Sequence, residues 1–357
     1  MRLKVIVCGT TFGQSYMRAI SMSDSLELVG IYAKGSKRSV DCSKIYNVPL
    51  FSDLDTIPDS VDIAFVIIKS GVLGGEGTEI SKHLLEKGIN VMQEHPINHS
   101  EISECFKIAI ENNVFYKVGN LYPYLENIQI FCNASRYLSS RDAFQYGSVM
   151  SSSQGLYGLS SILIKSLNNP RSYMINKSET VQRYPFSNIR ISNGQSDIFL
   201  QIHNEISDKD SNNHMHLLHR IIYFFNSGRL ELNDTFGSVI WRSRMNVSDA
   251  SAYRNENNRS DTSSLMECIL ADEKEETYSR LLEKIFPSSI KMQIDNFIEE
   301  IRDKNMNGIE LQRELLISKK WSDITHEISF PRLTKFDENY NDYTRGLKAL
   351  RNTNEKC

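Results

Sequence analysis

A histidine flanked by a glutamate and a proline is the residue group in this sequence best suited to chemistry. Glu94, His95 and Pro96 stand in the stretch NVMQEHPINHS, residues 90–100, directly after a short apolar run. An imidazole changes its charge near neutral pH, so it can give a proton to a substrate or take one from it. The apolar run indicates a buried strand, and open α/β sheets bind ligands where their parallel strands end. The alternative is a turn histidine that bonds only to the backbone.

Apolar runs alternate with helix-like segments from residue 1 to about residue 120. The expected strands are Leu3–Cys8, Leu26–Tyr32, Ile63–Ile68, Ile89–Gln93 and Phe115–Val118. The segments between them with helical spacing are residues 14–23, 36–47, 78–88 and 103–113. Strands that alternate with helices predict βαβ units and a parallel sheet. Several of these strands are almost wholly apolar, which is typical of a sheet covered on both faces.

After about residue 120 the sequence becomes richer in polar residues. Short runs within residues 146–155, 197–207 and 229–241 alternate between apolar and polar side chains. This alternation predicts antiparallel strands with one face in water.

Two segments in this second half have helical spacing, residues 215–228 and residues 289–308. The second places Ile290, Ile294, Phe297, Ile298 and Ile301 on one stripe, with Gly308 as a stop. An exposed loop is expected at residues 249–264, which are rich in Ser, Asn, Asp and Arg. The polar tail, residues 339–357, is expected to be partly disordered.

Length and composition exclude several classes of protein. A chain of 357 residues suggests about two domains, and a net charge of −3 with interspersed signs does not suit nucleic-acid binding. The six cysteines form no Cys-x-x-Cys pair, so they imply neither a zinc site nor a disulfide framework. We therefore expect reduced thiols in a cytoplasmic protein. No apolar run resembles a signal peptide or approaches the roughly 18 residues of a membrane span.

The first strand leads into a glycine-containing turn, VIVCGTTFGQSY. Gly9 stands where a dinucleotide-binding turn needs its first glycine, but Thr11 and Gln14 occupy the positions of the other two. Gly9 still permits a tight turn, and the free N–H groups at the start of the next helix suit a pyrophosphate. The alternative is a βα turn that binds nothing. We expect a dinucleotide at Gly9, Thr10, Thr11, Phe12 and Gly13.

The segment after the second strand favours NADPH over NADH. An NAD enzyme has an acid about 20 residues after its glycine turn to hold the ribose 2′-hydroxyl. The stretch LVGIYAKGSKRSV has no acid, but it has cations and hydroxyls that suit a 2′-phosphate. The alternative is a solvated basic loop. The residues assigned to this role are Gly35, Ser36, Lys37, Arg38 and Ser39.

The loop after the third strand, IIKSGVLGGEGTE, is expected at the same edge of the sheet. Ser70 and the glycines that follow it would let the backbone lie close to the cofactor. The alternative is a flexible loop without a ligand.

The Glu-His-Pro stretch resembles one family. A strand ending in Glu-Lys-Pro marks the glucose-fructose oxidoreductase and inositol dehydrogenase superfamily, in which the lysine is usually catalytic. The resemblance implies an α/β protein with an N-terminal Rossmann domain, residues 1–120. It also implies a C-terminal α/β domain with a large, mostly antiparallel sheet, residues 121–357, for substrate binding and homodimerisation. Sugar-oxidising members also have an Asp and His pair, which residues 153–167 lack. The missing lysine and the missing pair argue against sugar oxidation.

A narrower resemblance is to the thiazolinyl imine reductases of yersiniabactin- and pyochelin-type siderophore biosynthesis. The similarity is strong from Arg2 to about Tyr124, recurs to about Trp241 and is faint beyond. It implies NADPH-dependent reduction of a thiazoline C=N to a thiazolidine. The substrate would be a thioester on a carrier domain of a nonribosomal peptide synthetase. The blocks that carry the similarity are GTTFGQSYMRA, GSKRS, GGEGTEISKHLL, QEHPIN, NLYPYL, MHLLHR and FGSVIW.

His95 and Tyr122 are the candidate catalytic residues. Hydride attack on an imine leaves charge on nitrogen, and a positioned acid typically contributes roughly 10²–10⁴-fold. A histidine titrates in the right range, whereas a free lysine titrates near about 10.4. The resemblance carries over Tyr122 from NLYPYL as a donor to the imine nitrogen or a residue that orients it. A packed aromatic is the alternative for Tyr122. Glu94 is expected at the nicotinamide ribose, and a cis peptide before Pro96.

The stretch NNHMHLLHR invites a metal interpretation, because His216 and His219 would share a helix face. No acid or cysteine lies at ligand spacing, so we expect no metal, and these histidines to pack near the site or on the sheet. Two other functions remain open: reduction of a small sugar or carbonyl compound, and NADP(H) sensing without catalysis.

Overall fold

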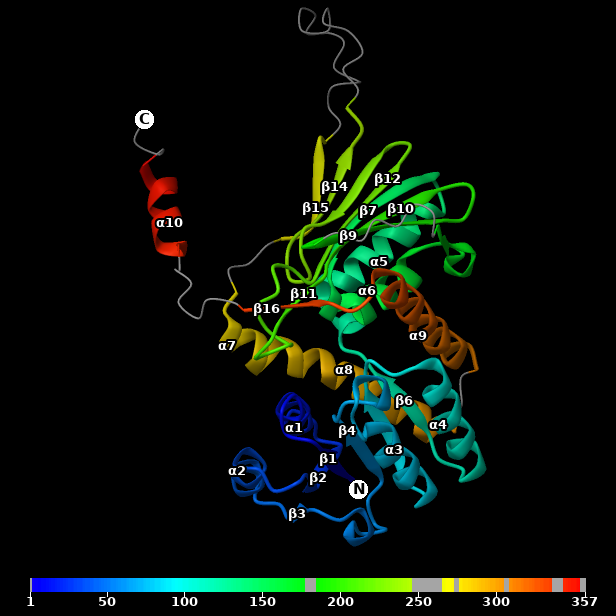
Figure 1. The fold of residues 1–357 in the computed structure, drawn as a ribbon, viewed down its shortest axis with the longest axis vertical. Helices are drawn as coiled ribbons and strands as arrows, with labels where there is room; N and C mark the ends of the chain where they lie inside the picture. The colour runs from blue at the N-terminus through cyan, green and yellow to red at the C-terminus, as the bar shows by residue number, and fades with distance from the viewer. Residues whose placement is uncertain are drawn as a thin grey trace, which may run out of the picture.

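The computed structural model describes residues 2–176, 184–245, 265–272, 276–304, 308–335 and 343–353. Figure 1 shows a lower unit built on a parallel sheet, an upper unit built on a second sheet, and helices between them. The loop expected at residues 249–264 lies outside the described residues.

A six-stranded parallel sheet forms the first unit, in the order β3-β2-β1-β4-β5-β6 that defines a Rossmann fold. Its strands are β1 (Leu3–Cys8), β2 (Leu26–Tyr32), β3 (Leu50–Phe51), β4 (Ile63–Val66), β5 (Asn90–Glu94) and β6 (Tyr116–Gly119). Its helices are α1 (Gly13–Ser21), α2 (Lys37–Tyr46), α3 (Gly77–Glu86) and α4 (His99–Glu111), with the short turns η1 (Leu54–Thr56) and η2 (Gly71–Leu73). The predicted strands, helices and parallel sheet are confirmed, and β3 is an additional edge strand.

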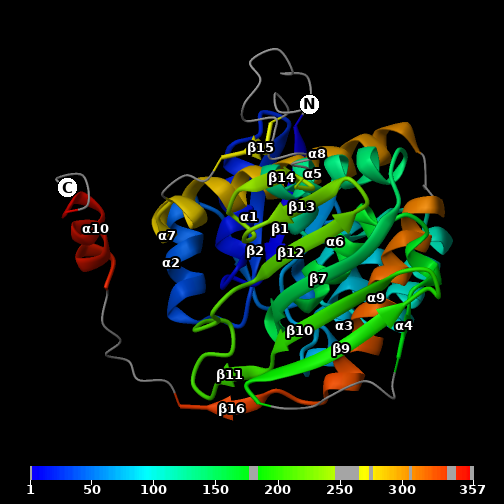
Figure 2. The ribbon, with the colours of Figure 1, turned by 90° about the horizontal axis from the view of Figure 1, so that it is seen from above.

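An eight-stranded sheet forms the second unit, in the order β15-β14-β13-β12-β7-β10-β9-β8. Figure 2 shows its strands from above, with helices beneath them. The strands are β7 (Phe144–Ser152), β8 (Met174–Ile175), β9 (Phe186–Ser192), β10 (Asp197–His203), β12 (His219–Phe225), β13 (Gly228–Leu232), β14 (Val239–Ser243) and β15 (Glu267–Ala271). The predicted antiparallel pairing is confirmed for most neighbours, but β10 runs parallel to β7.

The remaining elements lie outside the two large sheets. The helices and turns are η3 (Tyr122–Tyr124), α5 (Glu126–Ser139), η4 (Ser153–Gly155), α6 (Leu156–Ser166), η5 (Pro170–Ser172), α7 (Tyr278–Arg280), the π-helical η8 (Leu281–Ile285), α8 (Phe286–Asp303), α9 (Gly308–Ile328) and α10 (Thr344–Thr353). The strands β11 (Glu205–Ser207) and β16 (Arg332–Thr334) pair separately.

The helix predicted over residues 215–228 is wrong, because the middle of this segment, His219–Phe225, is strand β12. His219, Ile221, Tyr223 and Phe225 are buried, while the residues between them are less so. This period of two is that of a strand with one covered face. The segment is rich in β-branched and aromatic residues, which favour strands, and its apolar density also permitted a helical interpretation.

The helix predicted over residues 289–308 is confirmed as α8, but its predicted end is wrong. The helix stops at Asp303 with Lys304 in a left-handed conformation, φ 50°. Gly308 begins α9 rather than ending α8. In the tail predicted to be partly disordered, residues 344–353 form α10, which stands away from the body in Figure 1.

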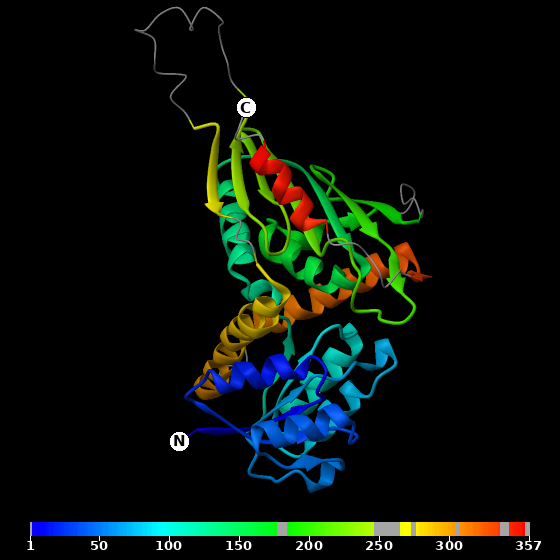
Figure 3. The ribbon, with the colours of Figure 1, turned by 90° about the vertical axis from the view of Figure 1, so that its left-hand side faces the viewer.

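Helices α8 and α9 come late in the chain but bind the first unit. Figure 3 shows α8 along the Rossmann domain and α9 between the two units. Hydrogen bonds join this late part of the chain to Rossmann residues: Arg18 Nη1 donates to the Leu282 carbonyl at 3.0 Å, Gln293 Nε2 to the Val118 carbonyl at 3.1 Å, Ser318 Oγ to the Ile97 carbonyl at 2.6 Å and Lys117 Nζ to the Glu300 carboxylate at 2.5 Å. The last three of these bonds hold the chain at the ends of β5 and β6 from outside the Rossmann domain.

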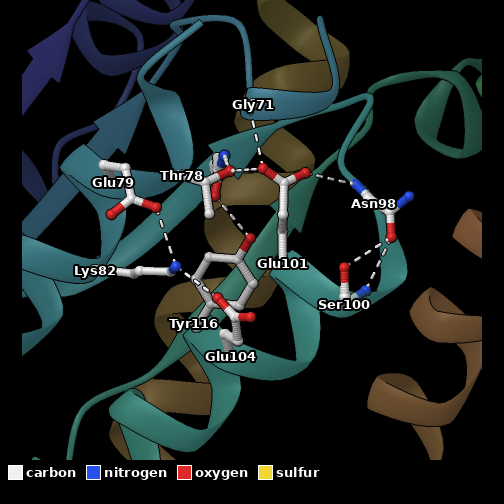
Figure 4. Close-up of polar contacts among 10 residues, drawn as sticks. Gly71, Thr78, Glu79, Lys82, Asn98, Ser100, Glu101, Glu104 and Tyr116 are labelled. Carbon is white, nitrogen blue, oxygen red and sulfur yellow. Dashed lines mark hydrogen bonds and ion pairs between the residues drawn. The ribbon is translucent and has the colours of Figure 1, made fainter. Parts of the chain in front are cut away.

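The carboxylate of Glu101 joins three segments at the edge of the parallel sheet (Figure 4). One oxygen accepts from the Gly71 N–H at 3.0 Å and the Thr78 hydroxyl at 2.8 Å, and the other from the Asn98 N–H at 3.0 Å. The loop after β4, the start of α3 and the start of α4 are therefore fixed to one another. Asn98 follows the Glu94-His95-Pro96 stretch, so this carboxylate also anchors that stretch.

Replacing Glu101 with Gln should lower the free energy of unfolding by about 1–3 kcal/mol, since the amide group cannot accept all three bonds. Urea denaturation measures this loss. The control is Glu104→Gln, because Glu104 is exposed and pairs only with Lys82 at 2.5 Å. Its loss should stay below about 1 kcal/mol. Equal losses in the two variants would contradict the anchoring role.

Candidate active site

His95 directly follows β5, and one backbone carbonyl, that of Gly119 at the end of β6, holds it in place. Its N–H donates to the Gly119 oxygen at 3.0 Å, and its ring Nδ1 lies 2.8 Å from the same oxygen. Because a carbonyl can only accept, Nδ1 carries a proton, which leaves Nε2 as the atom that can exchange one. The peptide before Pro96 is cis, as predicted.

Glu94 lies beside His95 and controls its charge. One carboxylate oxygen of Glu94 is 3.2 Å from His95 Nδ1. The other accepts a hydrogen bond from the hydroxyl of buried Tyr16. Burial alone would lower the pKa of His95, but the charge and hydrogen bond of Glu94, with the Gly119 carbonyl, raise it above its usual value. A proton therefore stays on the imidazole to a higher pH than in water.

Tyr122 lies between two imidazoles at the start of η3. Its ring meets His95 edge-on at 6.0 Å between centroids and His219 at 4.9 Å. Gly158 on α6 makes room for it, because a Cβ there would lie 2.6 Å from the Tyr122 ring. Burial, and then the charge of Glu94, raise the pKa of Tyr122, so its hydroxyl keeps its proton. The structure thus brings the two predicted catalytic residues together.

His219 is an uncharged residue that lines this site rather than a metal ligand. Its Nε2 donates to the Gly155 carbonyl at 2.8 Å, and its Nδ1 lies 3.0 Å from the Thr235 hydroxyl. Burial lowers the pKa of His219 to about 4, and the His95 charge adds to this effect. Within the described ranges, no cluster of His, Cys, Asp and Glu could hold a metal ion.

Tyr157 is a site residue that sequence reasoning did not single out. Its ring stacks on His95, with centroids 4.9 Å apart and planes at 23°. It lies on α6, in the region that has neither the Asp nor the His of sugar-oxidising relatives. No local pattern in the sequence marks Tyr157, because its ring meets His95 only where α6 packs beside the end of β5.

The glycine turn has the geometry expected of a dinucleotide site. Gly9 has φ 96°, and a Cβ there would lie 2.5 Å from the Ile67 carbonyl. None of the described side chains caps α1, and within its first turn the Ser15 N–H donates to the Phe12 carbonyl at 2.9 Å, which leaves the N–H groups before it for a pyrophosphate. Thr10 is buried and Thr11 is exposed, while Phe12 packs against Phe286 at 5.9 Å. Gly13 begins the helix.

The segment after β2 presents a second helix start. The Ser36 hydroxyl accepts from the Ser39 N–H at 3.3 Å, which caps α2, and Lys37 and Arg38 are exposed in its first turn. The Ser39 side chain instead turns inward and donates to the Ser36 carbonyl at 2.7 Å. Gly35 has φ 80°, which a side chain would strain.

Ser70 connects the cofactor edge to the His95 stretch. Its hydroxyl is buried and donates to the Pro96 carbonyl at 2.7 Å. The glycines after it are required by the loop itself: a Cβ at Gly75 would lie 2.1 Å from the Lys69 carbonyl, and one at Gly77 would lie 2.2 Å from the Ile68 carbonyl.

Two family models match the chain. Residues 3–120 match the oxidoreductase family with an NAD-binding Rossmann fold, known as GFO_IDH_MocA. Residues 134–242 match the C-terminal domain of thiazolinyl imine reductases of the Irp3-like type. The chain is therefore an oxidoreductase of the Gfo/Idh/MocA class with an NAD(P)-binding Rossmann domain. Over residues 134–242 it is similar to the C-terminal domain of Irp3-like thiazolinyl imine reductases.

Solved structures of low identity share this fold. GenD2 from gentamicin A biosynthesis, in complex with NAD, has a TM-score of 0.66 at 11% identity, with 92% of this chain and 94% of that one covered. KijD10, a 3-ketoreductase from Actinomadura kijaniata in complex with NADP and TDP-benzene, has a TM-score of 0.65 at 11% identity, with coverage of 94% and 100%. No curated protein sequence matches the chain.

Five of the cysteines lie in the described residues. Cys8, Cys42, Cys105, Cys132 and Cys268 are free thiols. None of the described helices is long and apolar enough to cross a membrane.

Replacing Glu94 with Gln should lower the pKa of His95, because the nearby carboxylate is the largest influence that raises it. An NMR titration of the His95 ring measures the change. The matched control is Glu79→Gln, which removes an exposed carboxylate paired with Lys82 and should leave His95 unchanged. An unchanged or higher pKa in the Glu94 variant would contradict this account.

Proposed function

We propose that the protein uses NADPH to reduce a thiazoline C=N to a thiazolidine. The observation that carries this proposal is the match of residues 134–242 to the Irp3-like C-terminal domain. The Glu94–His95 pair supports it, since it places a histidine where most relatives of this class have a lysine. Reduction of a sugar or carbonyl compound is the competing enzymatic function, and NADP(H) sensing the non-catalytic one.

The residues of the site suit protonation of an imine nitrogen. NADPH, when bound, supplies the hydride that adds to the imine carbon. His95 Nε2 holds the proton that the nitrogen needs, because Nδ1 is occupied by Gly119 and Glu94. Tyr122 orients the nitrogen, and neutral His219 adds no competing positive charge to the wall. Tyr157 covers the imidazole face and limits the orientations of the ring.

The residues at the glycine turn and at the start of α2 would hold NADPH. The free N–H groups of α1 suit the pyrophosphate, and Lys37 and Arg38 suit a 2′-phosphate. Lys34 pairs with Glu76 at 2.9 Å, so the positive charge of Lys34 offsets the negative charge of Glu76 on the loop after β4. In this proposal the substrate is a thioester on a carrier domain of a nonribosomal peptide synthetase in siderophore biosynthesis, in the cytoplasm. Homodimerisation stays a prediction.

A carrier-tethered thiazolinyl thioester should be reduced while NADPH is oxidised. The fall in NADPH absorbance measures the rate. His95→Ala should lower kcat by roughly 10²–10⁴-fold, and Tyr122→Phe by about 10-fold or more. The rate should fall as pH rises through the raised pKa of His95, because the protonated imidazole is the acid. In Glu94→Gln this fall should begin at lower pH.

Matched controls for this assay are His99→Ala and Tyr137→Phe, since both side chains are exposed and lie outside the site. Both should retain the wild-type rate. Wild-type rates in both site variants would contradict the assignment of His95 and Tyr122 as catalytic residues. Turnover of free sugars with NADP⁺ and none of the thioester would favour the competing enzyme, and cofactor binding without any hydride transfer would favour the sensor.

NADPH should bind more tightly than NADH, and Arg38→Ala should remove about 10-fold or more of NADPH affinity while leaving NADH unaffected. Fluorescence titration of each cofactor measures the dissociation constants. Lys44→Ala, on the last turn of the same helix, is the control. Tighter binding of NADH than of NADPH would refute the role of the α2 start.

A further inference from the structure

A polar cavity of about 480 Å³ opens at the junction of the two units, away from the glycine turn. Its lining comes from both units and includes Lys117 on β6, Tyr124 on η3, Lys165 on α6 and Glu310 on α9. A second cavity of about 30 Å³ shares Lys117, Glu300 and Glu310 with it and continues to Glu314. The smaller cavity has room for water, which needs about 10–15 Å³. Glu314 therefore lines a small space that adjoins the larger cavity at Lys117, Glu300 and Glu310.

Glu314 has a carboxylate that can exchange a proton near neutral pH. Its Oε2 is shielded from solvent and has no hydrogen-bond partner among the described residues. Burial, and then the charge of Glu310, raise the pKa of Glu314 to about 7, against the opposing charges of Lys165, Lys117 and Arg313. A carboxyl of this kind is present in both its protonated and its ionised form near neutral pH.

Tyr157 on α6 packs against α9, the helix that carries Glu314, because its ring lies 5.6 Å from the ring of Trp321. Its hydroxyl is buried without a partner in the described part of the chain, while its ring stacks on His95 at 4.9 Å. Burial raises the pKa of Tyr157, and the charges of Glu314 and then Glu94 raise it further. The hydroxyl is therefore within electrostatic reach of both carboxylates. The charge of Glu314 also acts on His95 itself.

The proposed reaction consumes one proton in each turnover, so His95 must be protonated again. We propose that Glu314 and the Tyr157 hydroxyl return this proton to His95 from the junction cavity. After His95 Nε2 gives its proton to the imine nitrogen, the Tyr157 O–H supplies another through water and takes one from the Glu314 carboxyl. The Glu314 carboxylate regains a proton from water in the cavity. No electrons move in these steps, and the net change is one proton taken from solvent.

Charged and titratable groups face Glu314 from each element packed around it. These groups are Glu310 and Arg313 on α9, Lys165 on α6, Lys117 and Tyr116 on β6, and Glu300 on α8. Lys117 pairs with Glu300 at 2.5 Å, and Arg313 with Glu310. Glu314 is thus the carboxylate of this group whose Oε2 has no partner in the described structure. This inference rests on the proposed function, since it concerns the proton that His95 donates.

Glu314→Gln and Tyr157→Phe test the path, with Asp323→Asn on the same helix as the control. Both test variants replace an atom that has no hydrogen-bond partner, so both should fold. Steady-state reduction of the carrier-tethered thiazoline is measured in dilute buffer and with increasing imidazole. In dilute buffer, kcat should fall by about tenfold in both test variants and return with imidazole, while KM stays constant. Wild type and the control should not depend on buffer concentration.

Two outcomes of this assay would overturn the proton path: wild-type kcat in dilute buffer, or a loss that imidazole does not restore. If the wild type does not reduce the thiazoline, the proposed function fails, and NMR exchange of the His95 ring N–H with water decides the path separately. With NADP⁺ bound, this exchange should be about tenfold slower in the two test variants than in wild type. Equal exchange rates would refute the path.

Discussion

The pairing of β5 with β6 is the constraint on which the site depends, because it presents the Gly119 carbonyl to His95. That single oxygen accepts from the backbone and the ring of His95, so it fixes both the position of the residue and the ring nitrogen that carries a proton. With the ring fixed in this way, the Glu94 carboxylate lies beside the protonated Nδ1 of His95. A shift of either strand by one residue would move all three groups and reverse which side chains face the site.

The second unit completes this arrangement with small residues and rings rather than with charges. Gly158 admits the Tyr122 ring, Tyr157 covers the imidazole, and His219 stays neutral because burial lowers its pKa. A positively charged wall would oppose the proton on His95, since like charges disfavour each other in a buried site. The chemistry therefore depends on contacts between the units as much as on β5 itself.

Local patterns in the sequence predicted what depends on local structure. The Rossmann strands follow from buried apolar runs, and Gly9 from the tight turn after β1. His95 was placed correctly at a strand end. Tyr157 and Glu314 could not be found, because their importance arises where α6 and α9 pack near His95, and no local period reports that packing. Residues 215–228 were wrongly predicted to be a helix, because their many apolar residues fit the period of a helix as well as that of a strand. Only burial against the sheet selects the strand.

Lys117 on β6 and Glu300 on α8 form a partly buried ion pair across 183 positions of chain. During vectorial synthesis on the ribosome, β6 leaves the exit tunnel long before its counter-charge does. An unpaired buried lysine is costly, so the nascent nucleotide-binding unit keeps this edge hydrated until α8 arrives. The nucleotide-binding unit is therefore finished by a helix translated after the second sheet.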